Sequence, residues 1–181
     1  IKSFSLPESL ETIGTNAFIG CDSYYFKTIN IPKKVKIIGN RAFNGCDFLT
    51  EINVAEGNSM YCSESGVLYN ADKTILLQYP AGNLNKVYII PETVMEIADY
   101  AFSGYMNLES IGIPSGLKKI GWDNFDDRTI QNILYPLSSE DWDNIDIQPY
   151  NSELSSANYH FNFDLVHSEN VASTCLEKGH Y

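Results

Sequence analysis

The stretch IPKKVKIIGNRAFNGCDFL, residues 31–49, decides the fold because the chain repeats it at a regular spacing. Related strings are LPESLETIGTNAFIGC from Leu6, IPETVMEIADYAFSGY from Ile90 and IPSGLKKIGWDNFDDR from Ile113. Their prolines are separated by 25, 59 and 23 residues, and the phenylalanines repeat the same intervals (Pro7, Pro32, Pro91, Pro114; Phe18, Phe43, Phe102, Phe125). Two separate markers therefore define one structural unit that is used several times.

Each unit contains one short strand followed by a turn. In Ile29-Asn30-Ile31 the alternation places the two isoleucines on one face and the asparagine on the other, which predicts a half-buried strand. Pro32 lacks the amide hydrogen that a strand needs, so it ends the strand and turns the chain away. Ala42-Phe43 then places a small residue beside a ring that fills the coil. One coil buries too few apolar side chains to fold alone, so the coils must stack.

A period of 22 to 25 residues with one strand per unit predicts a leucine-rich-repeat solenoid, because ankyrin, TPR and HEAT units are longer and helical. We predict an α/β solenoid, a right-handed superhelix. It has one short parallel strand per coil on the concave face and an irregular or short-helical convex side.

Two segments depart from the repeat. The interval of 59 residues holds a further strand, Ile52-Asn53-Val54, and then a variant unit at about residues 55–87. There, Val67-Leu68-Tyr69 and Thr74-Ile75-Leu76-Leu77 around residues 70–73 predict a β-hairpin with a four-residue loop. Near the end, Ser138 with Asp141 three residues later predicts a capped short helix that carries Trp142 and Ile145 onto the last coil. We predict a C-terminal cap at about 135–164, one solenoid over 1–164, and a linker or the start of a following domain at 165–181.

The repeat resembles the BspA-type leucine-rich repeats of bacterial cell-surface proteins, whose pattern I-P-x-x-V-x-x-I-G-x-x-A-F-x-x-C-x-x-L matches residues 31–49 at every specified position. The resemblance covers about residues 3–163. It implies a secreted or surface-anchored bacterial protein that adheres to host proteins or other cells, and it carries over no catalytic or binding residues. The unit from Ile113 departs most, since Trp122-Asp123-Asn124 replaces x-x-Ala and Arg128 stands where cysteine is expected.

Composition limits the partners. The 23 acidic and 12 basic residues give a formal charge of -11, which disfavours nucleic acid and anionic membrane surfaces. No run of about 18 apolar residues is present, so we expect no membrane insertion. The chain opens on Ile1 and not on Met, so we expect a mature or trimmed fragment.

The residues that could carry chemistry form no recognisable catalytic set. Cys21 and Cys46 occupy the same position in successive coils, where we expect free buried thiols, with a disulfide as the alternative. Neither Cys62 nor Cys175 has a partner that the sequence reveals. The three histidines, His160, His167 and His180, all lie outside the repeats, so a nucleophile within the repeats would have no histidine as its base. Together with Cys175, these histidines match no structural zinc spacing.

Acidic residues gather in one part of the sequence, which suggests either a calcium site or a carboxylate pair for glycoside hydrolysis. These residues are Asp123, Asp126, Asp127, Glu140, Asp141, Asp143 and Asp146. The D-x-D-x-D-G loop is missing, so we expect a solvated acidic rim. We predict no enzymatic activity, no cofactor and no metal site.

The outward strand positions are the predicted binding surface, because solenoids use extended sheet faces for partners. They are Thr28, Asn30, Glu51, Asn53, Val87, Ile89, Ser110, Asn132 and Leu134, with Gly112 in the same row. A plain exterior is the alternative for these positions. The surface aromatics Tyr24, Tyr25 and Tyr150 are a rival location.

The predicted function is a monomeric adhesion or protein-interaction module, extracellular or on a bacterial cell surface. Its expected ligand is an unknown host extracellular or cell-surface protein, with a glycan as a second choice. The alternatives are a structural spacer that displays an adjacent domain and a carbohydrate-binding module.

Overall fold

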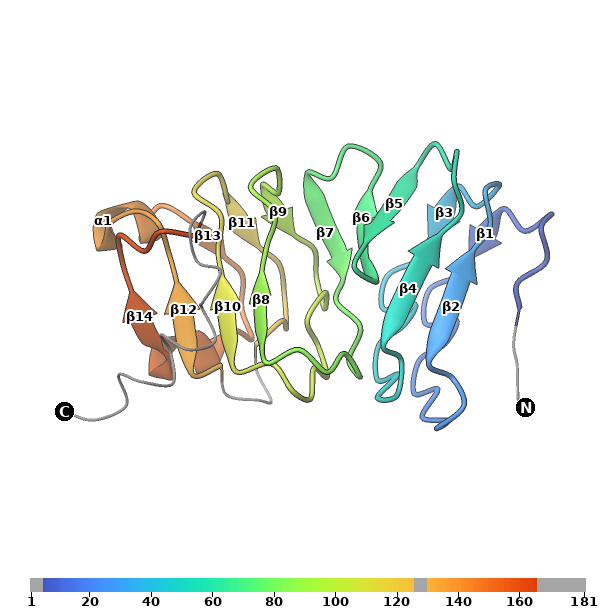
Figure 1. Ribbon diagram of the computed structural model, residues 1–181, viewed down its shortest axis with the longest axis horizontal. Helices are drawn as coiled ribbons and strands as arrows, with labels where there is room; N and C mark the ends of the chain where they lie inside the picture. Colours follow the sequence, from blue (N-terminus) through green and yellow to red (C-terminus); the bar gives the residue numbers. More distant parts are fainter. Residues whose placement is uncertain (1–4, 126–129, 166–181) are drawn as a thin grey trace.

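The computed structural model describes residues 5–125 and 130–165 as a row of stacked coils (Figure 1). Its strands are β1 (Thr12–Ile13), β2 (Thr28–Ile31), β3 (Ile37–Ile38), β4 (Glu51–Val54), β5 (Tyr61–Glu64), β6 (Val67–Asn70), β7 (Ile75–Gln78), β8 (Val87–Ile89), β9 (Glu96–Ile97), β10 (Ser110–Gly112), β11 (Lys119–Ile120), β12 (Asn132–Leu134), β13 (Asp146–Ile147) and β14 (Asn158–His160). Its helices are α1 (Ser139–Trp142) and the 3-10 helix η1 (Ser152–Ser156).

Parallel strands form two ladders along the row. The first contains β2–β4 and β8–β10–β12–β14, and the second contains β1–β3 and β7–β9–β11–β13. The one-strand-per-coil prediction for the first ladder is confirmed: Thr28 pairs with Glu51, and Ser110 pairs with Asn132. The solenoid with parallel strands is confirmed, but the α/β part of the prediction is not, because the second side carries short strands, two residues long except for β7, and the described chain has little helix.

The repeat itself prevents helix formation on the second side. The residue two positions before each phenylalanine has a left-handed backbone (Asn16, φ 58; Arg41, φ 55; Tyr100, φ 62; Asp123, φ 54). A residue with positive φ interrupts a right-handed helix, so the turn after each short strand cannot continue as one.

Aromatic rings stack along the interior from coil to coil. The rings of Phe18 and Phe43 are 5.6 Å apart, and those of Phe102 and Phe125 are 5.2 Å apart. In the variant unit Tyr79 takes the phenylalanine position and stacks on Phe102 at 5.2 Å. The sequence carried a signal for Tyr79, since it precedes Phe102 by 23 residues, as Phe102 precedes Phe125.

The variant unit is a wall between two hydrophobic cores. The predicted hairpin is confirmed as β6–β7, and β5 adds a third antiparallel strand that the sequence analysis missed. Successive side chains of β6 point to opposite faces. Val67 and Tyr69 therefore join the core of the C-terminal coils, whereas Leu68 joins the core of the N-terminal coils. Both faces of this strand are buried.

The wall also divides each ladder of parallel strands into an N-terminal and a C-terminal part. The edge of β4 is occupied by the hairpin, because the Ile52 amide donates to the Gly66 carbonyl at 2.8 Å and the Val54 amide donates to Ser63 Oγ at 2.9 Å. On the second side the Ile38 amide donates to Tyr61 Oη at 2.9 Å. Side chains and a turn thus satisfy backbone groups that a regular coil would pair.

The C-terminal segment extends both ladders, since β14 pairs with β12 and β13 pairs with β11. The predicted capped helix is confirmed: Ser138 and Asp141 form a capping box at the start of α1. Trp142 and Ile145 are buried against the C-terminal core, as predicted. The predicted linker or following domain at 165–181 lies, apart from Leu165, outside the described residues.

Two buried amides tie the last coil to its neighbours. Asn124 stands where other coils have alanine; its Oδ1 accepts from the Phe102 amide at 3.0 Å, and its Nδ2 donates to the carbonyls of Ala98 and Gly121. Asn151 Oδ1 in turn accepts from the amides of Asn124 and Phe125. The departure of this unit from the repeat therefore has a structural cause.

We predict that the wall makes the two cores energetically separate. Phe43→Leu and Phe102→Leu should each lower the free energy of unfolding by about 1–2 kcal/mol, and their effects should add within about 0.5 kcal/mol because they lie in different cores. Phe102→Leu and Phe125→Leu, whose rings touch, should deviate from additivity by more than that. Urea unfolding of the single and double variants measures this. Equal coupling in both pairs would contradict the two-core description.

We also predict that Asn124→Ala, which restores the residue of the other repeats, is destabilising. It would leave the Phe102 amide without a partner and would remove one of the donors to each of the carbonyls of Ala98 and Gly121, so the expected loss is about 1–3 kcal/mol by thermal or chemical unfolding. Ala101→Gly in the neighbouring coil is the matched control for a change at the same repeat position, with an expected loss of about 1 kcal/mol. A neutral Asn124→Ala variant would show that the amide has no structural role.

Candidate interaction surface

The predicted binding surface is open in its N-terminal part. Thr28, Asn30 and Glu51 are exposed, and Asn53 is half-buried, at the outward positions of β2 and β4. The two strands pair in register, with Thr28 opposite Glu51 and Asn30 opposite Asn53. These four residues are called the open face below, and β2 and β4 carry them at the N-terminal end of the row (Figure 1).

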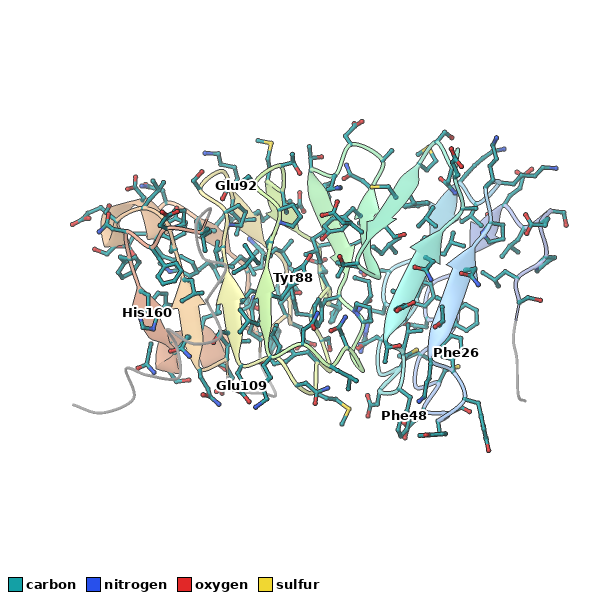
Figure 2. The ribbon with its side chains drawn as sticks, viewed as in Figure 1. Phe26, Phe48, Tyr88, Glu92, Glu109 and His160 are labelled. Atoms are coloured by element: carbon teal, nitrogen blue, oxygen red, sulfur yellow. The ribbon has the colours of Figure 1, made fainter. Side chains whose placement is uncertain are left out.

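An exposed aromatic cluster adjoins the open face. Tyr24 and Tyr25 are 61% and 62% exposed, and the Tyr24 ring meets Tyr25 and Phe48 edge-on at 5.7 Å each. Lys27 Nζ lies 4.5 Å from the centre of the Tyr24 ring, close enough for a cation–π contact. Phe48 lies at the lower end of β4 (Figure 2). Tyr24, Tyr25 and Phe48 are called the aromatic cluster below.

The rival tyrosines of the sequence analysis do not form one site. Tyr24 and Tyr25 are together, whereas Tyr150 lies with Trp122 at the other end of the chain, at 5.8 Å between ring centres. Sequence analysis missed Phe48. A signal existed, since Tyr25 and Phe48 are 23 residues apart and so occupy the same position in successive coils.

The C-terminal part of the predicted surface is covered. Ser110 is 2% exposed and Leu134 is 0% exposed, so the prediction that they face solvent is wrong. Val87, Ile89 and Asn132 are half-buried. Part of the physical reason is that the chain passes over β10 after β14, where the Leu165 side chain lies against Gly112. The six residues Val87, Ile89, Ser110, Gly112, Asn132 and Leu134 are called the covered face below.

A row of polar groups crosses the covered face. Asn132 Nδ2 donates to Ser110 Oγ at 3.1 Å, and Asn132 Oδ1 is 3.1 Å from Nε2 of His160. These contacts link β10, β12 and β14 through side chains. His160 (Figure 2) therefore has a structural partner, and His167 and His180 lie outside the described residues.

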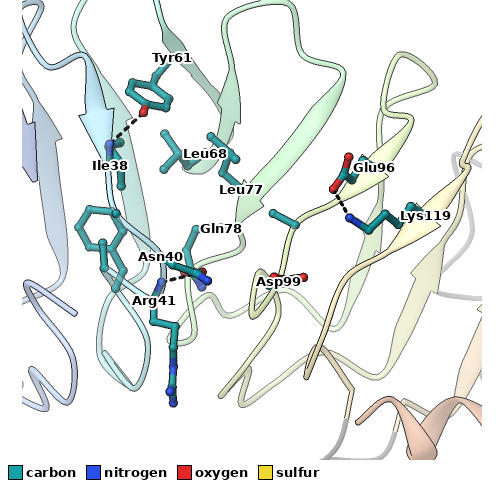
Figure 3. A pocket seen from close by; sticks show the side chains of 14 residues that line it. Ile38, Asn40, Arg41, Tyr61, Leu68, Leu77, Gln78, Glu96, Asp99 and Lys119 are labelled. Carbon is teal, nitrogen blue, oxygen red and sulfur yellow. Dashed lines mark hydrogen bonds and ion pairs between the residues drawn. The ribbon is translucent and has the colours of Figure 1, made fainter. Parts of the chain in front are cut away.

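A notch of about 330 Å³ opens between the two cores on the side of the second ladder (Figure 3). Its cause is a shortened coil. Leu76 pairs with Ile97, but only three residues lead from Leu76 to the ring of Tyr79, whereas five lead from Ile97 to that of Phe102. The variant coil thus lacks two residues of the outward turn.

Most polar groups that line the notch form hydrogen bonds or ion pairs within the protein. Asn40 Oδ1 accepts from the Arg41 amide, and Gln78 Nε2 donates to two carbonyls, those of Tyr79 and Ala101. Glu96 and Lys119 pair at 2.9 Å, which raises the pKa of Lys119. Arg41 lies over the Tyr100 ring at 4.6 Å, although its buried Nε has no hydrogen-bond partner within the described part of the chain. The second carboxylate of the lining, Asp99, also has a partner, because its Oδ1 accepts from the Trp122 amide at 2.9 Å.

The acidic residues have individual structural contacts. Asp141 belongs to the capping box of α1, and Asp146 accepts from Gln148 Nε2 at 2.8 Å. Hydrogen bonds from its own backbone amide and from Ser138 lower the pKa of Glu140. Within residues 5–125 and 130–165, no three His, Cys, Asp or Glu side chains gather as a metal site would require. Asp126 and Asp127 lie outside these ranges, so the solvated-rim prediction stays a prediction.

The repeat cysteines are free thiols, as expected. Cys46 is buried and its Sγ lies 3.1 Å from the carbonyl of Phe18, while Cys21 is half-buried. Burial raises the pKa of Cys46 to about 12, because the thiolate would lose its hydration. Cys62 is also free, and burial raises its pKa. Cys175 lies outside the described residues.

The repeat geometry and the sequence agree on a family. The BspA type leucine rich repeat region matches the sequence in six copies, over residues 1–86 and 78–178. The chain belongs to the BspA-type leucine-rich repeat family. Within the described ranges, this family member has no helix of the length and apolarity that crossing a membrane requires. No curated protein matches the sequence.

Solved structures of bacterial repeat proteins share the fold. A leucine-rich repeat protein from Eubacterium ventriosum is 29% identical with a TM-score of 0.67, covering 87% of this chain and 41% of that one. The pneumococcal vaccine antigen PcpA is 31% identical with a TM-score of 0.62, covering 71% and 38%. A leucine rich cell surface protein from Faecalibacterium prausnitzii is 20% identical with a TM-score of 0.57, covering 77% and 55%, which shows the fold alone. The chain thus spans about two fifths of the first two relatives.

We predict that Cys46 does not react with a thiol reagent such as DTNB in the native protein at pH 8. A pKa near 12 instead of 9.0 lowers the thiolate fraction about a thousandfold, and the thiolate is the reactive form. Denaturation should release this thiol to the reagent. Mass spectrometry that assigns the label to each cysteine measures the effect, with Cys21 as the half-buried comparison. Rapid native labelling of Cys46 would contradict its burial.

Proposed function

We propose that the chain is a non-enzymatic protein-interaction module, secreted or displayed on a bacterial cell surface, that binds a partner protein through the open face and the aromatic cluster. The observation that carries the proposal is the exposed aromatic cluster beside two paired strands whose outward side chains are polar. Tyr25 lies three residues before the start of β2, and Phe48 lies three residues before the start of β4. Exposed aromatics with a polar surround are the usual composition of a protein interface.

The physical properties of this surface fit such a role. Tyrosine and phenylalanine bury large areas at a low entropy cost, so they supply most of the binding energy when a partner covers them. The short polar side chains of the open face lie on hydrogen-bonded strands, so a partner finds them preorganised. The covered face offers less, because three of its six residues, Ser110, Gly112 and Leu134, are already buried.

Family membership and one relative support the proposed location. The BspA-type resemblance implies a bacterial surface protein. PcpA, at 31% identity, is a vaccine antigen, and a useful antigen must be accessible to antibodies. The chain is a fraction of that relative's length, so the proposal concerns this segment and not a whole protein.

The test is a direct binding measurement on a defined panel. Purified host extracellular-matrix and epithelial surface proteins, and a glycan array, are presented to the immobilised chain by surface plasmon resonance. For a protein that binds, Tyr25→Ala and Phe48→Ala should each weaken affinity about tenfold or more, and Asn53→Arg should do the same by obstructing the open face.

Tyr150→Ala is the matched control, because Tyr150 is as exposed as Tyr25 but lies at the other end of the chain. It should change affinity less than about twofold. A protein ligand whose affinity falls with Tyr150→Ala but not with Tyr25→Ala would place the site elsewhere. Binding of glycans alone would favour the carbohydrate-binding alternative, and no binding at all would favour the spacer.

A further inference from the structure

The notch between the two cores lies where one member of a repeated series of hydrogen bonds is missing. In the turn after a regular second-ladder strand, the residue with the left-handed backbone donates its amide to a carbonyl of the next coil. These bonds run from Asn16 to Asn40 at 3.1 Å, from Tyr100 to Trp122 at 2.8 Å and from Asp123 to Pro149 at 3.3 Å. Each turn thus contributes one peptide group, whose carbonyl accepts from the preceding coil and whose amide donates to the following coil.

The variant coil lacks this peptide group. Its turn is two residues shorter, and the missing positions are those of Asn40–Arg41 and Asp99–Tyr100 in the coils on either side. The Arg41 amide, the next donor of the series, bonds instead to the side chain of its neighbour, at Asn40 Oδ1. The Asp99 carbonyl, the next acceptor, has no hydrogen-bond partner in the part of the chain that the structure describes.

The gap has the width of one missing layer. At the turns before the first ladder, the variant coil contacts both of its neighbours. There the Gly82 amide donates to the Leu49 carbonyl at 2.9 Å, and on the other side the Ala81 carbonyl accepts from the Met106 amide at 3.1 Å. Stacked strands are about 4.8 Å apart, so the two turns that flank the missing one are separated by about 10 Å.

The notch is large enough for a ligand. The missing turn leaves a space of about 330 Å³ (Figure 3), which lies at the lower end of the range of about 300–1,000 Å³ that ligand pockets occupy. The side chain of Arg41 reaches over the Tyr100 ring, at 4.6 Å, and so connects the two flanking turns. The space is therefore bounded by parts of both cores.

The free polar groups of the notch are those that a peptide group needs. Arg41 supplies two donors, its amide and its buried Nε, which has no hydrogen-bond partner within residues 5–125 and 130–165. The Asp99 carbonyl is an acceptor on the opposite wall. Gln78 Nε2 donates to the carbonyls of Tyr79 and Ala101, which leaves Oε1 of this buried side chain as a second acceptor. Donors and acceptors thus face a group that carries both a carbonyl and an N–H.

We propose that the notch binds a tight turn of a partner polypeptide, which inserts the missing peptide group between the two cores. The carbonyl of that group accepts from the Arg41 amide and its N–H donates to the Asp99 carbonyl, so the series of hydrogen bonds becomes continuous. Asn40 Oδ1, displaced from the Arg41 amide, is on an exposed residue and returns to water. Main-chain hydrogen bonds supply the affinity, as in other modes of recognition in which a partner's backbone completes a ladder.

The repeat also specifies the conformation of the bound turn. The residue after the inserted peptide group takes the position of Arg41 and Tyr100, both of which have positive φ. Glycine and asparagine adopt that conformation most readily, so the partner's turn carries one of them there. This site goes beyond the proposed function, because it lies on the side of the second ladder and the open face belongs to the first.

The test titrates the isotopically labelled chain with acetyl-asparaginyl-glycine methylamide and follows the backbone amides by NMR. The central peptide group of this probe carries the required carbonyl and N–H, and its glycine accepts a positive φ. The Arg41 amide signal should shift and saturate, with a dissociation constant on the order of 1 mM, as expected of so small a ligand. An Arg41 signal that does not respond would overturn the proposal.

A matched probe tests the hydrogen bond to Asp99 without any change in the protein. It has N-methylglycine in place of glycine, which removes the N–H of the central peptide group. This probe should bind at least about fivefold more weakly, because the Asp99 carbonyl then has no donor. Equal binding of the two probes would contradict the proposed geometry.

A variant with a filled notch tests the place of binding. Insertion of asparagine and glycine between Leu77 and Gln78 restores the two missing residues, so this variant should lose the response to the probe and protect the Arg41 amide from hydrogen exchange. The same insertion between Leu84 and Asn85, two exposed residues before β8, is the matched control and should respond like the unchanged chain. Circular dichroism and thermal unfolding verify that both variants are folded. An undiminished response of the filled variant would overturn the proposal.

Two further measurements separate this site from its alternatives. N-acetylglucosamine also carries a secondary amide, and tighter binding of this sugar than of the peptide at Arg41 would assign the notch to a glycan and overturn the choice of a polypeptide. Tyr25→Ala, in the aromatic cluster, should leave probe binding unchanged. A failure of the proposed function would therefore be seen in the protein panel and not in this titration.

Discussion

Burial of each coil's apolar side chains against the next coil is the interaction on which the whole structure depends. A coil contributes about five or six such side chains, at roughly 1.5 to 3 kcal/mol each, which is comparable with the entropy cost of ordering its residues. The ring stacks Phe18–Phe43 and Tyr79–Phe102–Phe125 are examples of this packing between neighbouring coils. No coil can lose its neighbour without losing most of its own stability.

The variant unit follows from the same constraint. Because a three-stranded meander interrupts the stack, it has to present an apolar surface to both sides, and β6 does so with alternate side chains. It also has to satisfy the backbone groups on the interrupted strands. Tyr61 and Ser63 supply their hydroxyls, and the Gly66 carbonyl accepts from Ile52. Gly66 is required there, because a Cβ would approach Glu51 Cα to 3.0 Å.

The outward positions have a different status from the inward ones. An inward residue must fit between two coils, so its type is limited to apolar groups or to fully hydrogen-bonded amides such as Asn124. An outward residue on β2 or β4 has no such limit, and its side chain is available to a partner. The residues of the open face are therefore available for recognition, whereas those of the covered face are buried or half-buried within the chain itself.

The sequence by itself determined the family, the coil spacing, the strand in each coil, the β6–β7 hairpin and the capping box of Ser138 and Asp141. These features depend on alternation, on proline and on short-range hydrogen bonds, which neighbouring residues encode. Only the tertiary structure decided that β5 joins the hairpin, that the second side is a strand ladder, that Tyr24 meets Phe48 from another coil, and that Leu165 closes over Gly112. The physical reason is that exposure and contact depend on which distant segments meet, and a local pattern such as Ser110-Ile111-Gly112 is the same whether its outward face meets water or another part of the chain.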